Sequence, residues 1–266
     1  MKISALVSDV DGTLVTSGKT VTDASRKAVS ALRERGIDFA VISGRPPRGM
    51  QMLVEPFALT APLAGFNGGA FTNPDLSPIE EHVLAPETAQ RAFDWLRTKG
   101  IDVWAFSGLD WFVLDLDGPH IATEIRAVHF APTVVRTLEP ALASAFKIVG
   151  VSADHALLAR CEEELQPVLG ESASASRSQP YYLDITHPTA NKGIAVVRLA
   201  ALMGVPMAEI AVIGDGHNDL GMFAQGGLSI AMGNAPPDVR EHARFVTSSN
   251  DHDGFAEAVR NHILNA

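Results

Sequence analysis

The sequence has little cysteine, a shortage of positive charge and no long apolar run. Its 266 residues include a single cysteine, Cys161, so no disulfide can form within the chain, and we expect a reducing, cytoplasmic compartment. Lys and Arg number 21 against 31 Asp and Glu, which gives a formal net charge of −10. This charge disfavours binding to nucleic acid, which needs a basic surface, but a local site can still bind a small anion.

No apolar stretch reaches the roughly 18 residues that a membrane-spanning helix needs, so we expect no membrane partner. The N-terminal stretch "MKISALVSDVDG" runs into acidic residues and lacks a small-residue cleavage site, which favours a strand over a signal peptide. Hydrophobic residues make up 46% of the chain and charged residues 20%, enough for a sizeable core. The length is compatible with one large domain or two moderate ones.

Apolar strand patterns alternate with helix patterns near both ends of the chain. Strands are expected at 3–10, 37–44, 61–69, 208–216 and 227–234, and helices at 22–36, 191–204 and 253–264. Thr22 is a candidate N-cap of the first helix, and Gly36 is its stop signal. Near-continuous apolar strands between helices predict an α/β fold, with a Rossmann-like parallel sheet covered on both faces.

The middle of the chain has a different pattern, which predicts an inserted α+β domain. It contains helix patterns at 86–100 and 154–170, two short strands within 103–115, and strands at 145–152 and 180–186. Cys161 lies in the second of these helices, where we expect a packed thiol. The Ser-rich stretch 171–180 is expected to be an exposed turn. The predicted domains are therefore a core of 1–82 and 188–266 and an insert of 83–187.

Four polar clusters follow directly on four apolar strands. In open α/β sheets, ligands bind outside the carboxyl ends of the strands, so these clusters are expected to meet at one edge. A polar loop after one strand is ordinary, but four loops with carboxylates, glycines and phosphate-type donors are not. The clusters are Asp9 and Asp11, then Ser43, Gly44 and Arg45, then Asn67, Gly68 and Gly69, and finally Asp215, Gly216, Asn218 and Asp219.

The carboxylates of Asp9, Asp11, Asp215 and Asp219 are expected to share one small space. Two carboxylates about 4 Å apart repel each other by about 4 kcal/mol at an effective dielectric constant near 20. Either some of them keep a proton or a cation lies among them. A set of oxygen ligands without cysteine favours Mg²⁺ over zinc.

The same edge offers groups that could bind an anion. Gly12 and Thr13 can present backbone N–H groups in a tight turn, and Ser43 offers a hydroxyl. Lys192 begins the predicted helix at 191–204 and offers its charge together with helix N-terminal amides. A divalent metal, a lysine, a hydroxyl and a turn of backbone amides together describe a phosphoryl site.

The motifs "DVDGTL", "VISGR", "NKG" and "GDGHND" resemble, in order, the four motifs of the haloacid dehalogenase (HAD) superfamily. The insert lies between the second and third motifs, which is similar to the Cof-type, class IIB capped phosphatases. The resemblance implies a HAD-like core, a type C2B cap at 83–187 and hydrolysis of phosphomonoesters. Two positions depart from the common pattern: "NGG" replaces the frequent "NGA", and Asn191 replaces the usual serine before Lys192.

The resemblance also implies roles for the acidic residues. Asp9 would be the nucleophile that forms an aspartyl-phosphate, and Asp11 would protonate the leaving oxygen and then activate water. Mg²⁺ would be held by Asp9, by the backbone carbonyl of Asp11 and by Asp215. Asp219 would order the waters of the metal or support its ligands.

The remaining motif residues would bind the phosphoryl group or the substrate. Ser43 and Lys192 would hold the phosphoryl oxygens, with Gly12, Thr13 and Gly44 nearby. Two roles stay open: Arg45 touches substrate or pairs with an acid, and Asn191 acts in the motif or caps the helix. Asn218 would contact phosphate or orient Lys192, and Asn67 would lie on the substrate side.

The leading hypothesis is thus an Mg²⁺-dependent phosphatase of small phosphorylated metabolites, with sugar phosphates as the class that the family suggests. A sugar-phosphate phosphotransferase or mutase resembling phosphomannomutase is the alternative enzyme. A non-catalytic phospholigand-binding protein is the alternative of another class. The oligomeric state stays open.

Overall fold

The structure is a computed structural model that describes residues 2–265, and it divides into two compact units. The core unit comprises Met1–Ile79 and Asn191–Ala266, and the insert unit is Glu80–Ala190. The chain enters the insert unit after Ile79 and leaves it after Ala190. Each of these two boundaries lies three residues from the one expected from the sequence, after residue 82 and after residue 187. Among the described residues, no helix combines the length and the apolar character that crossing a membrane requires.

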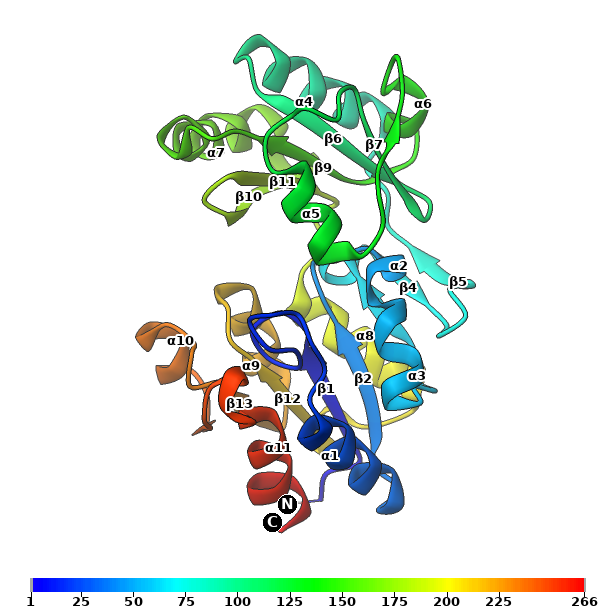
Figure 1. The fold of residues 1–266 in the computed structure, drawn as a ribbon, viewed down its shortest axis with the longest axis vertical. Coiled ribbons are helices and arrows are strands. Elements are labelled where there is room, and N and C mark those ends of the chain that lie inside the picture. The colour runs from blue at the N-terminus through cyan, green and yellow to red at the C-terminus, as the bar shows by residue number, and fades with distance from the viewer. Residues whose placement is uncertain (1, 266) are drawn as a thin grey trace. The chain divides into compact units, whose positions relative to one another are not determined.

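An eight-stranded, mainly parallel sheet forms the centre of the core unit (Figure 1). Its strands lie in the order β14-β13-β12-β1-β2-β3-β4-β5. All neighbours from β14 to β3 are parallel, whereas β4 runs antiparallel to β3. The bounds are β1 Ala5–Asp9, β2 Asp38–Ile42, β3 Leu63–Gly65, β4 Ala70–Thr72, β5 Pro78–Glu81, β12 Ile210–Gly214, β13 Leu228–Ala231 and β14 Phe245–Val246.

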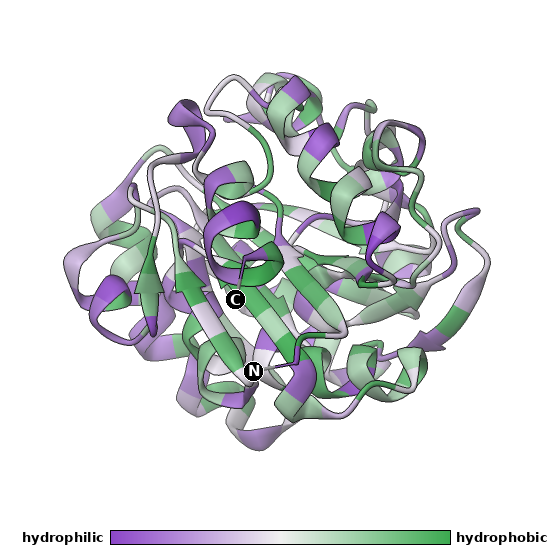
Figure 2. Ribbon diagram, turned by 90° about the horizontal axis from the view of Figure 1, so that it is seen from below, coloured by the Kyte–Doolittle hydropathy of each residue, from purple (hydrophilic) through white to green (hydrophobic). Residues whose placement is uncertain are grey.

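Helices cover both faces of this sheet. Successive strand residues point to opposite faces, and both faces carry apolar side chains that pack against helices. Leu6 faces a cluster that includes side chains of α1 (Asp23–Glu34), α3 (Val54–Phe57) and α11 (Gly254–Ala258). Val7 faces a second cluster with α8 (Lys192–Met203) and α9 (Leu220–Gln225). In Figure 2 the central strands are mostly hydrophobic, whereas the helices around them alternate between hydrophobic and hydrophilic residues. The predicted α/β fold with a parallel sheet is confirmed.

The ends of the helices follow local signals in the sequence. The Thr22 side chain accepts a hydrogen bond from the Ser25 N–H and caps α1, and Gly36 has a φ of +69° just after that helix. The expected helix 253–264 is α11 followed by one π-helical turn, Val259–Leu264. The remaining short helices of the core unit are α2 Pro47–Met50 and α10 Pro237–Glu241.

The expected strand 61–69 is shorter in the structure. It ends at Gly65, and a 3-10 turn follows at Phe66–Gly68. Phe66 and Asn67 have φ values of +53° and +57°, which a regular strand does not allow. The chain therefore turns at the point where the third polar cluster begins.

The insert unit contains a six-stranded sheet in the order β10-β11-β9-β6-β7-β8. Helices α4 and α7 share one apolar cluster with this sheet, and Cys161 of α7 is buried in it as predicted. The strand bounds are β6 Asp102–Ser107, β7 Asp110–Val113, β8 Thr133–Val134, β9 Ala145–Val151, β10 Ser174–Gln179 and β11 Tyr182–Thr186. The helix bounds are α4 Pro86–Thr98, α5 Ile121–Val128, α6 Glu139–Leu142 and α7 His155–Leu169.

The prediction of an exposed turn at 171–180 is wrong, because most of this stretch is strand β10. It pairs antiparallel with β11 and is the last strand of its sheet. Polar residues suit such an exposed edge strand, so the Ser-rich composition hides the strand from a hydrophobic pattern. Contacts with α7 hold the strand in place: Glu162 accepts from the N–H and the Nε of Arg177, both at 2.7 Å.

Candidate active site

The ends of strands β12, β1, β2 and β3 place the four polar clusters at one edge of the core sheet. These strands are parallel neighbours in that order, so their carboxyl ends lie side by side. Hydrogen bonds connect the clusters directly. Thr13 Oγ1 lies 3.3 Å from Asp215 Oδ1, and Asn218 Nδ2 lies 3.4 Å from Asn67 Oδ1. The chain thus brings together loops that are up to about 200 residues apart in sequence.

Three carboxylates and one lysine form the centre of this site. Asp9, Asp215 and Asp219 each offer an oxygen atom within 4.8 Å of the others. Lys192 Nζ lies 2.5 Å from Asp9 Oδ1 and 2.6 Å from Asp219 Oδ1. The side chain of Lys192 is 1% exposed, and the side chains of Asp9 and Asp219 are 6% and 0% exposed. Lys192, Asp9 and Asp219 are therefore held almost out of water, whereas Asp215 is half-buried.

The electrostatics of this group leave negative charge uncompensated. Burial raises the pKa of Asp9 well above its ordinary value; the Lys192 ammonium opposes this rise, while Asp219 and Asp215 add to it. Burial and the Asp219 carboxylate raise the pKa of Asp215 to about 6. Burial disfavours the Lys192 ammonium, but Asp219 and Asp9 outweigh it and raise the pKa of this lysine. One lysine thus does not balance three carboxylates, and a cation fits among them.

Asp219 also organises the loop after β12. Its Oδ2 accepts from the N–H groups of Asp215 at 2.9 Å and Gly216 at 2.8 Å, while its Oδ1 accepts from Lys192. A Cβ at Gly214 would lie 2.4 Å from Asp219 Cγ, so the strand end approaches this carboxyl closely. Asp219 holds both the Asp215 backbone and Lys192, which suits a residue that supports metal ligands.

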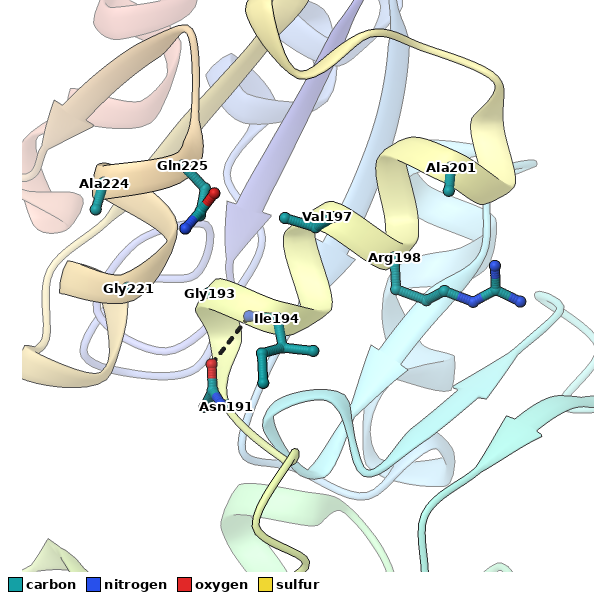
Figure 3. Close-up of a pocket in the computed structure, with 9 residues that line it drawn as sticks. All are labelled: Asn191, Gly193, Ile194, Val197, Arg198, Ala201, Gly221, Ala224 and Gln225. Carbon is teal, nitrogen blue, oxygen red and sulfur yellow. Dashed lines mark hydrogen bonds between the residues drawn. The ribbon is translucent and has the colours of Figure 1, made fainter.

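Asn191 caps the helix that presents Lys192. Asn191 Oδ1 accepts from the Ile194 N–H at 2.9 Å (Figure 3). Asn191 therefore has the capping role that the sequence left open.

The close-up in Figure 3 also shows that α8 and α9 approach each other at Gly193 and Gly221, whose backbones are in contact. A cavity of about 540 Å³ lies between these helices and is lined by Ile194, Val197 and other residues of α8 and α9, but not by the three carboxylates.

Asp11 differs from the expectation that four carboxylates share one space. Its side chain lies outside the group and is held by Arg45 Nε and Nη2 at 2.6 and 2.7 Å and by Lys19 Nζ at 2.6 Å. Burial opposes its ionisation, but hydrogen bonds and charge from Arg45, together with Lys19, lower the pKa of Asp11 to about 2. Strand β1 ends at Asp9, so strand alternation does not govern Asp11, and the two cations set its direction.

Several predicted phosphate-binding residues lie just after strands β1 and β2, namely Thr13, Ser43 and Gly44. Ser43 is buried, and its Oγ accepts from the Arg45 N–H at 3.1 Å. A Cβ at Gly44 would lie 3.6 Å from the Asn67 amide, so Gly44 and Asn67 are adjacent. The Thr13 N–H donates a long hydrogen bond, 3.4 Å, to the Val10 carbonyl.

Two residues of the site were not predicted from the sequence. Lys19 reaches Asp11 from a turn after the first motif, and no pattern in the sequence marks it. Asn234 lies 2.9 Å from the Gly12 carbonyl and 3.1 Å from Asp215 Oδ2. It follows strand β13 as the other polar clusters follow their strands, so the same rule could have found it.

Replacing Gly12 by Ala is expected to lower the free energy of unfolding by about 3 kcal/mol, because the backbone strain and a collision add up. Gly12 has a φ of +80°, and a Cβ would lie 2.2 Å from Asp215 Oδ2. Gly36→Ala is the matched control, since its φ is +69° and nothing lies within 4 Å of its Cβ. We expect about 1 kcal/mol there. Urea denaturation of both variants measures the difference, and equal losses would rule out the collision.

Comparisons with known proteins identify the family. The sequence profile of the haloacid dehalogenase-like hydrolases matches residues 6–259. A crystal structure of a haloacid dehalogenase-like hydrolase from Bacteroides thetaiotaomicron is 28% identical and has a TM-score of 0.90, covering 97% of this chain and 99% of the other. A HAD subclass IIB sugar phosphatase is 22% identical with a TM-score of 0.82, covering 97% and 98% of the two chains, which shows a shared fold.

A curated relative supports the same assignment. The HMP-PP phosphatase of Cronobacter sakazakii is 27% identical over 231 residues, which are 87% of this chain and 84% of the relative. The resemblance seen in the four motifs is confirmed. The chain therefore belongs to the haloacid dehalogenase-like hydrolases and is an enzyme of their phosphatase group.

Proposed function

We propose that this protein is an Mg²⁺-dependent phosphomonoester hydrolase of small phosphorylated metabolites that works through an aspartyl-phosphate. The observation that carries the proposal is the buried group of Asp9, Lys192 and Asp219 beside Asp215. A carboxylate nucleophile, a fixed ammonium and further metal-type oxygens are the parts that phosphoryl transfer requires.

The donor set fits Mg²⁺. It consists of carboxylate oxygens without cysteine or histidine, and its charge exceeds what Lys192 supplies. Asp9, Asp215 and the backbone carbonyl of Asp11 would hold the ion, and Asp219 would support them. When bound, Mg²⁺ supplies positive charge to the phosphoryl oxygens and lowers the repulsion between Asp9 and the substrate.

In the first step a carboxylate oxygen of Asp9 attacks phosphorus in line with the leaving oxygen. The new Asp9–phosphorus bond forms as the bond to the leaving oxygen breaks. Lys192 and Ser43 hold the phosphoryl oxygens. Asn218 contacts the phosphate or orients Lys192, and Asn67 lies on the substrate side. Lys192 has the position for this role, because its Nζ already lies 2.5 Å from Asp9 Oδ1.

Asp11 would carry the protons in both steps. Arg45 and Lys19 keep it ionised in the free enzyme, so it must first take up a proton. Solvent supplies this proton, and the negative charge of a bound phosphoryl group raises the pKa of Asp11 so that the carboxyl can hold it. Asp11 then gives the proton to the leaving oxygen. In the second step it takes a proton from the water that attacks the aspartyl-phosphate, and Asp9 is released with free phosphate.

We assign the catalytic domain to residues 1–82 and 188–266 and the cap to 83–187, as in class IIB phosphatases. The cap would select the leaving group. A sugar phosphatase among the proteins with the same fold makes sugar phosphates our first candidate class.

Magnesium removal is the first test of this function. We expect the purified enzyme to hydrolyse p-nitrophenyl phosphate with Mg²⁺ and to lose at least about 99% of this rate with excess EDTA, because ion charge stabilises the transferring group. Added Mg²⁺ should restore the rate. Turnover of p-nitrophenyl phosphate and of a panel of sugar phosphates, followed as free phosphate, checks this. A rate that is insensitive to EDTA would contradict the metal dependence, and activity only with a bisphosphate sugar would favour the mutase.

A further inference from the structure

Asn234 lies just beyond strand β13 and joins two loops of the site through one side-chain amide. Its Nδ2 lies 2.9 Å from the carbonyl oxygen of Gly12, in the loop after β1. The same nitrogen lies 3.1 Å from Oδ2 of Asp215, in the loop after β12. An amide nitrogen has two hydrogens, so it can donate to both acceptors at once.

The other end of the amide fixes its orientation. Asn234 Oδ1 accepts from the backbone N–H of Asn250 at 3.0 Å. A backbone N–H can only donate, so the oxygen of the amide must face Asn250 and the nitrogen must face Gly12 and Asp215. Asn250 is itself anchored, because its Nδ2 donates to the Val15 carbonyl at 2.9 Å. The amide of Asn234 is therefore held in one direction by the C-terminal part of the core unit.

This contact leaves Asp215 with one anchored and one available oxygen. Oδ2 accepts from Asn234, while among the described residues Oδ1 receives only the long 3.3 Å contact from Thr13 Oγ1. The backbone N–H of Asp215 is fixed separately by Asp219 Oδ2 at 2.9 Å. The carboxylate is thus oriented from both its backbone and its side chain, with Oδ1 as the oxygen that remains for a cation.

We propose that Asn234 is a positioning residue that orients the Asp215 carboxylate, and with it the Gly12 loop, for binding of a divalent cation. The inference rests on the proposed function, because it concerns the same metal site. Asn234 acts through Asp215 and need not touch the cation itself. Residues that orient metal ligands through hydrogen bonds typically contribute 10-fold to 100-fold to metal affinity, and we expect an effect of about tenfold here.

The test uses the full chain and magnesium chloride alone, without substrate. The midpoint of thermal unfolding is measured against Mg²⁺ concentration, because an ion that binds the folded state raises this midpoint. For Asn234→Ala we expect an apparent Kd for Mg²⁺ about ten times that of the unmodified protein. The Mg²⁺ concentration for half-maximal turnover of p-nitrophenyl phosphate should rise by the same factor, while kcat falls by a smaller one.

Asn250→Ala is the matched control. It removes the hydrogen bond to Val15 from the same loop but leaves the backbone N–H that holds Asn234. This variant should unfold at a lower temperature without metal and keep the apparent Kd. An unchanged Kd in Asn234→Ala, or an equal rise in both variants, would overturn the inference. If the unmodified protein itself shows no response to Mg²⁺, the metal dependence of the proposed function fails instead.

Discussion

Asp9→Asn is expected to lower the turnover of p-nitrophenyl phosphate by at least about a thousandfold, because the amide cannot form the acyl-phosphate. The change keeps the shape of the side chain, and the folded state should persist. Burial and two neighbouring carboxylates raise the pKa of Asp9, and Lys192 keeps Asp219 as a partner at 2.6 Å when the charge of Asp9 is removed. We therefore expect the thermal midpoint without metal to stay the same or rise.

The control for Asp9→Asn is the same substitution at Asp238. This residue lies in the core unit and pairs with His217 at 2.7 Å, outside the group of carboxylates. Asp238→Asn should retain the turnover of the unmodified enzyme. Steady-state assays measure the turnover of both variants, and thermal unfolding measures their midpoints. A fully active Asp9→Asn enzyme would remove the nucleophile from the proposed mechanism.

Lys192→Met is expected to have the second-largest effect, on stability as well as on rate. The substitution leaves Asp9 and Asp219 buried without their ammonium partner. Breaking a buried ion pair from one side typically costs about 3–5 kcal/mol of unfolding free energy. Turnover should fall at least about a hundredfold, since the phosphoryl oxygens lose a fixed positive charge. Urea denaturation and steady-state kinetics measure the two effects.

Lys147→Met provides a matched control in the insert unit. Lys147 also forms a buried pair with a carboxylate, Asp184, at 3.4 Å, and both side chains are about 10% exposed. We expect this variant to lose stability but to keep its turnover of p-nitrophenyl phosphate. If both lysine variants lost activity in proportion to stability, Lys192 would be a structural residue only.

The sequence predicts the main strands because each of them is a local apolar run. It also predicts that the polar loops after these strands meet, because parallel neighbouring strands end at the same edge of a sheet. Apolar runs define the strands, and their parallel order brings Asp9, Lys192 and Asp215 together. Strand β10 escapes prediction because an edge strand with a Ser-rich face has no hydrophobic pattern. The short strand β14 is likewise too brief to produce a periodic signal.

Side-chain partners that come from distant loops could not be predicted. The direction of Asp11 depends on Arg45 and Lys19, which both donate to its carboxylate from other segments of the chain. Asn234 acquires its position only when the loops after β1, β12 and β13 are placed side by side. The sequence therefore supplies the chemical groups of the site, whereas the fold decides which of them pair with each other.

The central claim is that Asp9 carries the phosphoryl group, and trapping this intermediate tests it most directly. The enzyme is mixed with Mg²⁺ and p-nitrophenyl phosphate, quenched in acid within the first turnover and reduced with borohydride. Reduction converts an aspartyl-phosphate into homoserine, which peptide mass spectrometry can locate. We predict homoserine at position 9 and none in the Asp9→Asn variant. A phosphoryl group on another residue, or turnover without any acyl-phosphate, would contradict the account.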